Sequence, residues 1–87
     1  MASKKMQQYL MRTYDLYWNR IVRETVVKAI DDDTAIDIAR TAFDLLISPS
    51  DKLELQVGRK GIGRGNWCMF AAVYYDDTEI VIEDCYC

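Results

Sequence analysis

Residues 25–36, Thr-Val-Val-Lys-Ala-Ile-Asp-Asp-Asp-Thr-Ala-Ile, decide the fold class, because the hydrophobic rhythm of the chain changes within them. Up to Ile30 the segment is rich in β-branched residues and fits a strand. The aspartates Asp31–Asp33 are typical of a helix N-terminus, where carboxylates accept hydrogen bonds from unpaired N–H groups. After them the apolar residues recur at helical spacing, at Ala35, Ile38, Ala39, Ala42, Phe43 and Leu46. The sequence predicts a strand followed by an amphipathic helix over about 32–47, which ends before Pro49.

The segment before this unit is ambiguous. Apolar residues alternate over 14–18 and again over 25–29, but with opposite parity. This pattern favours strand, interrupted by a bulge or turn near Asn19-Arg20. A single long helix over 13–30 is the alternative. Residues 3–11 fit a short N-terminal helix capped by Ser3, so residues 1–12 are expected to be a helical or flexible tail.

From Leu53 to the C-terminus the pattern is that of β-structure. Residues 53–57 alternate with one polar face, and residues 67–75 are apolar on both parities, as in a central strand covered on both sides. A third strand, Glu79 to Cys87, follows a turn at Asp76-Asp77. Together with the earlier strand they predict a single α+β domain over 1–87. In this domain an antiparallel sheet of about four strands packs against one main helix.

Composition and charge restrict the class of protein. The 87 residues are 51% hydrophobic, which predicts a folded chain. The net charge of −3 argues against non-specific DNA binding, which needs a basic face. No apolar run approaches the roughly 18 residues of a membrane span, and no signal-peptide pattern opens the chain. We therefore expect a cytoplasmic protein without membrane contact, in which Cys68, Cys85 and Cys87 are reduced thiols that pack as small apolar groups.

The most distinctive polar feature is the segment 58–65, which holds all four glycines and the cations Arg59, Lys60 and Arg64. It lacks the spacing of either standard nucleotide-binding loop and lies between strands. Two interpretations remain open. The segment is a basic hairpin that inserts into a groove or onto a phosphate backbone, or it is a solvated turn without a role.

A second charged feature lies near the C-terminus. There an acidic edge either contacts a basic partner or protects an exposed edge strand from aggregation. Its members are Asp76, Asp77, Glu79, Glu83 and Asp84. Among the aromatic residues, we expect Tyr17, Tyr75 and Tyr86 at an exposed contact surface, and Trp18, Trp67 and Phe70 in the core.

Motifs for catalysis and metal binding do not emerge. The chain contains no histidine, so Cys–His and Ser–His catalysis is excluded within one chain. Asp31–Asp33 lack the spacing of a calcium loop. The three cysteines fall short of the four ligands of a structural zinc site. We therefore expect a protein that is not an enzyme and needs neither cofactor nor metal.

A further pattern combines Val27 and Ala29 at the end of a strand, an acidic segment, and Ala35 and Ala39 on a helix, over residues 20–45. In this pattern the chain resembles small α+β proteins of bacteriophages and mobile elements, among them anti-CRISPR inhibitors. The resemblance implies a compact inhibitor that binds a host defence protein or ribonucleoprotein complex and occludes its functional surface. Nucleic acid would then be contacted through the partner.

Two alternatives to this function remain. The chain is a small nucleic-acid-binding domain that uses the basic hairpin, or it is a structural subunit that forms a homodimer through the surface of residues 67–75.

Overall fold

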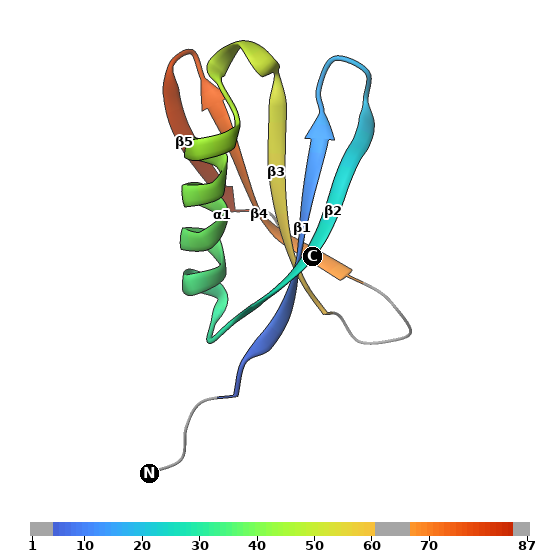
Figure 1. Ribbon diagram of the computed structural model, residues 1–87, viewed down its shortest axis with the longest axis vertical. Coiled ribbons are helices and arrows are strands. Elements are labelled where there is room, and N and C mark those ends of the chain that lie inside the picture. Colours follow the sequence, from blue (N-terminus) through green and yellow to red (C-terminus); the bar gives the residue numbers. More distant parts are fainter. Residues whose placement is uncertain (1–4, 61–66, 85–87) are drawn as a thin grey trace.

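The computed structural model describes residues 5–60 and 67–84. Its five strands form one antiparallel sheet in the order β2-β1-β3-β4-β5, with one α-helix lying against one face (Figure 1). The α+β class is confirmed, whereas the sheet has five strands rather than about four. The elements are β1 (Gln7–Asp15), β2 (Arg20–Ala29), α1 (Asp32–Leu46), the 3-10 helix η1 (Pro49–Asp51), β3 (Leu53–Lys60), β4 (Trp67–Asp76) and β5 (Glu79–Asp84).

The additional strand is β1, so the prediction of a helical or flexible tail is wrong for residues 7–12. β1 lies between β2 and β3. Its residues Tyr9, Leu10 and Met11 are all buried, which requires partners on both faces of the strand. Three consecutive apolar residues show no alternation, and the spacing of Met6, Tyr9 and Leu10 fitted one face of a short helix.

The strand interpretation of residues 13–30 is confirmed. β1 ends at Asp15, a turn follows, and β2 returns antiparallel to it. The register of this pair shifts between Thr13 and Tyr14. This bulge, together with the turn that ends at Asn19, accounts for the change of parity in the sequence.

The acidic start of α1 acts as predicted. Asp31 is the N-cap, and its Oδ1 accepts a hydrogen bond of 2.8 Å from the backbone N–H of Thr34. At the other end, Ile47 is extended and its N–H donates to the carbonyl of Phe43. The helix therefore ends directly before the Ser48-Pro49 segment, as the proline predicts. No helix within the described ranges is long and apolar enough to cross a membrane.

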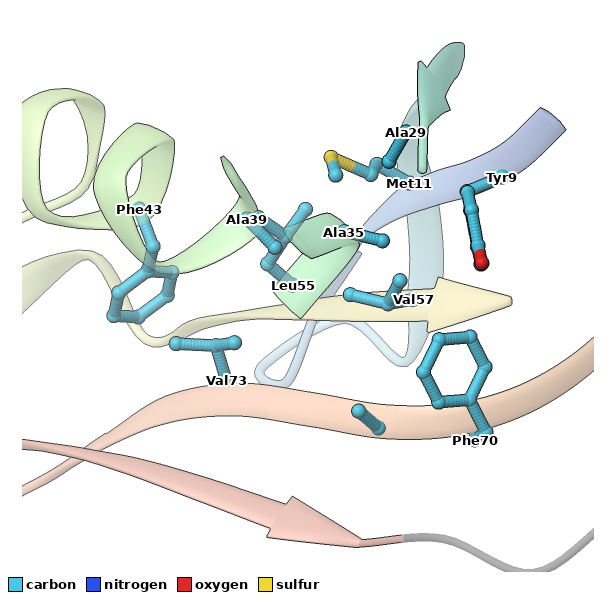
Figure 2. Packing of buried hydrophobic residues seen from close by; sticks show 11 residues of the cluster. Tyr9, Met11, Ala29, Ala35, Ala39, Phe43, Leu55, Val57, Phe70 and Val73 are labelled. Atoms are coloured by element: carbon cyan, nitrogen blue, oxygen red, sulfur yellow. The ribbon is translucent and has the colours of Figure 1, made fainter. Parts of the chain in front are cut away.

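The core lies between α1 and the sheet. The helix presents Ala35, Ala39 and Phe43, and each of them is fully buried. The two alanines allow the helix axis to approach the strands closely, while the Phe43 ring fills the space near the end of the helix. Figure 2 shows these side chains facing those of Tyr9, Met11, Leu55, Val57, Phe70 and Val73.

The predicted central strand is confirmed, since β4 lies between β3 and β5. The β3–β4 register shifts between Val57 and Gly58, opposite Phe70. A Cβ atom at Gly58 would lie 2.5 Å from the Sδ atom of Met69 and 3.4 Å from the carbonyl oxygen of Cys68, so the Met69 side chain occupies the space that a side chain at position 58 would need. Within the segment 58–65, only Gly58 to Lys60 lie in the described part, where they extend β3.

Candidate functional site

Three connections gather at one end of the sheet: the β1–β2 turn, the α1–β3 connection that contains η1, and the β4–β5 turn (Figure 1). Between them lies a cleft with a volume of about 670 Å³. It is the most promising candidate for a functional site, because side chains from three separate loops line it. The lining residues are Leu16, Tyr17, Pro49, Lys52, Leu53, Tyr75 and Asp77.

The β1–β2 turn carries an exposed aromatic pair beside this cleft. The side chains of Tyr17 and Trp18 are 70% and 66% exposed, and their ring centroids lie 4.9 Å apart with the ring planes at 82°. Such an edge-to-face arrangement is a favourable aromatic geometry. Tyr17 is therefore at the surface, as predicted, whereas the prediction that Trp18 lies in the core is wrong.

The turn is held rigidly from within. The Oδ1 atom of Asp15 accepts hydrogen bonds from the backbone N–H groups of Tyr17 at 2.9 Å and Trp18 at 3.0 Å. Asn19 takes the left-handed conformation with φ 54° and leads the chain into β2. The turn reverses the chain between residues 15 and 20, and the alternation of a strand does not extend through it. Trp18 therefore does not lie on the face of the sheet where the alternation of residues 14–18 would place it.

The floor of the cleft is anchored to the core. The N–H of Leu16 donates to the carbonyl of Lys52 at 3.1 Å, which ties the aromatic turn to the α1–β3 connection. The hydroxyl of Tyr75 donates to the carbonyl of Ile47 at 3.0 Å, and its ring packs 4.9 Å from that of Phe43. Tyr75 is half-buried, so it is less exposed than predicted: its ring and hydroxyl contact the core, and it also lines the cleft.

The β4–β5 turn adds negative charge to this end of the molecule. Asp77 lines the cleft, and its left-handed backbone (φ 62°) marks the tight turn. Asp76 and Glu79 are exposed beside it, where they face each other across the β4–β5 pair. The structure therefore brings part of the predicted acidic edge together with Tyr17. This combination of an aromatic pair and an acidic turn was not apparent in the sequence, because some 60 residues separate the two turns.

The remaining two acidic candidates lie elsewhere on β5. Glu83 accepts a hydrogen bond of 2.9 Å from the Tyr74 hydroxyl, and this bond is the main reason why the pKa of Tyr74 is raised. Asp84 lies opposite Ala71, toward the other end of the strand. β5 is an edge strand, so carboxylates do lie on an exposed edge of the sheet.

Two of the basic candidates, Arg59 and Lys60, lie at the opposite end of β3 from the cleft. Arg59 forms an ion pair with Asp32 at the start of α1, and its guanidinium carbon lies 5.2 Å from the centre of the Phe70 ring. The same carboxylate accepts a hydrogen bond of 2.7 Å from the Tyr9 hydroxyl. Arg59 therefore fastens the helix to the sheet, whereas Lys60 is exposed. Arg64 lies outside the described residues, as do Tyr86, Cys85 and Cys87.

The pKa of the Tyr9 phenol is raised to about 12. Burial is the largest cause, and the hydrogen bond to Asp32 is the second. Cys68 is disulfide-bonded, which corrects the expectation of a free thiol for this residue. Within residues 5–60 and 67–84, no group of three or more histidine, cysteine, aspartate or glutamate residues is placed to hold a metal ion.

Comparison with known proteins returns no relative: no family model, no curated protein and no solved structure matches the chain. Any functional conclusion therefore rests on the geometry of the chain itself.

Proposed function

We propose that this chain is a non-enzymatic protein-binding module, and that the cleft end of the sheet is its contact surface. The observation that carries this proposal is the solvent-exposed pair of Tyr17 and Trp18 on a turn that Asp15 holds in place. Tryptophan and tyrosine are the residues that most often dominate the free energy of protein–protein binding. A folded chain that keeps both in water leaves a large apolar area that a partner can bury.

Rigidity supports the same proposal. Binding costs free energy when flexible groups become ordered, and the two hydrogen bonds to Asp15 reduce that cost because the turn is already fixed. The bond between Leu16 and Lys52 fixes the turn relative to the cleft. A protruding part of the partner can therefore enter the cleft while the two aromatic rings cover a neighbouring apolar patch.

Charge defines the chemistry of the partner. Asp76, Asp77 and Glu79 are exposed at this end, with Lys52 as the cation beside the cleft. We infer a partner protein whose apolar contact patch is bordered by lysine or arginine side chains, because complementary fields accelerate association and disfavour wrong partners. The narrower prediction of an inhibitor that occludes a host defence complex rests on the sequence resemblance and fits this mode of binding.

The nucleic-acid alternative receives less support. It needs the cations of the basic segment free for phosphate, and the guanidinium of Arg59 is already engaged by Asp32 and the Phe70 ring. The exposed face of the cleft end carries carboxylates, which repel a phosphate backbone.

The proposal is tested by affinity capture from a lysate of the host, with and without nuclease, using three forms of the chain. The unmodified chain and a Lys60→Ala control should retain the same protein in equal amounts. A Tyr17→Ala/Trp18→Ala variant should lose most of it, because removing a hot-spot aromatic residue costs roughly 2 kcal/mol or more. Circular dichroism of the variant confirms that it remains folded.

Equal capture by all three forms would contradict the assignment of the surface. Loss of the captured protein on nuclease treatment would instead support the nucleic-acid alternative.

A further inference from the structure

The two edges of the sheet differ in how they are protected. β5 is a six-residue strand with exposed carboxylates at Glu79, Glu83 and Asp84, and such charges discourage pairing with another strand. β2 is a ten-residue strand without proline, and its residues 20–26 are all exposed. It also carries charges, Arg20, Arg23, Glu24 and Lys28, but these are of both signs, so they can pair across an antiparallel interface, whereas the charges of β5 are all negative. The unpaired N–H and C=O groups of β2 are available to a further strand. The exposed apolar side chains on and next to it are Ile21, Val22, Val26 and Ile30.

We propose that the β2 edge is a dimerisation surface, on which β2 of a second copy pairs antiparallel about a two-fold axis at Val26. The axis stands perpendicular to the sheet, so both copies keep their helices on the same side. The two five-stranded sheets then continue into one another through the β2–β2 pair. The inference is independent of the proposed function, because it concerns a different edge of the molecule.

The charge pattern of β2 selects this register. With Val26 opposite Val26, Glu24 of each copy faces Lys28 of the other, so two opposite-charge pairs flank an apolar centre. Lys28 is exposed and makes no ion pair with any described residue. The Glu24 carboxylate already accepts from Arg12 of its own chain at 3.2 Å, and its remaining lone pairs can accept from a lysine.

Neighbouring symmetric registers are less favourable. An axis at Glu24 would place two carboxylates opposite each other, and an axis at Arg23 would do the same with two guanidinium groups. An axis at Thr25 gives no opposite-charge pair. An axis at Val22 would pair Glu24 with Arg20, but Val22 lies at the register shift, where it has no partner on β1 and the strand is irregular. A two-fold axis perpendicular to the sheet places side chains of the same face opposite each other, so in each case the axis lies between the two copies of a single residue. Moving the axis by one residue therefore shifts the pairing register by two residues.

The helix side of β2 supports the same interface. Between α1 and the β1–β2 pair lies an open groove of about 220 Å³, and Figure 1 shows that the helix leaves much of these two strands uncovered. In the proposed register, Thr25 of one copy lies opposite Val27 of the other, and both residues line this groove in their own copy. The β1–β2 turns point away from each other, so the dimer presents two separate Tyr17–Trp18 sites.

The test is analytical ultracentrifugation of the full chain over a concentration series that reaches the high micromolar range. We expect a monomer–dimer equilibrium. Lys28→Glu should raise the dimer dissociation constant by about tenfold or more, since it places two carboxylates opposite each other at both pairs. Lys60→Glu makes the same charge change on β3, away from β2, and should leave the constant unchanged. The double variant Glu24→Lys/Lys28→Glu should restore most of the lost affinity.

Hydrogen exchange provides a readout that does not depend on any variant. Exchange at β2 should slow as the concentration rises, while exchange at β5 should not. A chain that stays monomeric at every concentration would overturn the proposal. So would a dimer that tolerates Lys28→Glu as well as it tolerates Lys60→Glu, or a β2 edge that becomes protected only when a strand of a different protein is supplied.

Discussion

Replacement of Phe43 by alanine should remove a large part of the stability of this fold. The ring is fully buried on the helix face that meets the sheet, and it packs against the ring of Tyr75. Truncating a buried phenylalanine costs about 3–5 kcal/mol, which combines lost burial with the cavity left behind. A chain of this length has a free energy of unfolding of about 4–13 kcal/mol. The loss is therefore about a quarter or more of the free energy of unfolding, and at the lower end of this range it leaves the variant unfolded.

Urea denaturation followed by circular dichroism measures this loss, and Leu45→Ala is the matched control. Leu45 lies on the same helix and is 76% exposed, so its truncation should change the free energy of unfolding by no more than about 0.5 kcal/mol. Similar losses in the two variants, or a larger loss for Leu45→Ala, would refute the assignment of the helix face that packs on the sheet. The Phe43 variant should also loosen the cleft, because Tyr75 forms part of its lining.

Three further predictions follow from individual contacts. Gly58→Ala should destabilise the chain by roughly 1 kcal/mol, and the penalty should largely disappear in a Met69→Ala background, because the added Cβ meets the Met69 sulfur. The pKa of Tyr9 is raised from about 10 to about 12 by burial and then by its bond to Asp32. The folded chain therefore holds a proton that the unfolded chain releases. The stability that this group contributes is complete below about pH 10 and disappears as the pH rises toward 12, so Tyr9→Phe should reduce the loss of stability over this range in denaturation curves. Thiol titration of the denatured, unreduced chain should find one free thiol, since the disulfide of Cys68 uses two of the three cysteines. Three free thiols would contradict that bond.

The helix and its boundaries could be predicted because their causes are local. Asp31 caps the first turn, small residues mark the buried face, and Pro49 ends the segment, all within 20 residues. The central position of β4 could also be predicted, because its residues 70–73 are apolar on both parities, and all four are buried in the structure. β1 was missed because its first two residues, Gln7 and Gln8, are polar and its buried residues do not alternate.

The candidate site was less accessible to sequence reasoning. Trp18 was assigned to the core because a large aromatic residue is usually buried, and only the turn geometry set by Asp15 reveals that it is exposed. Asp32 and Arg59 are 27 residues apart, so no local sequence pattern predicts their ion pair. This ion pair engages the guanidinium group that was expected to bind a partner. Where function depends on which loops meet, the tertiary structure has to supply the answer.

The account depends most directly on Trp18 standing in water while the chain is folded. In a Trp67→Phe variant, Trp18 is the single tryptophan, and acrylamide quenching of its fluorescence reports its exposure. We predict that quenching in the folded chain is close to that in the urea-unfolded chain, and that it falls when the captured partner protein is added. A Trp18 that is shielded from acrylamide in the folded, unbound chain would contradict the assignment of the contact surface.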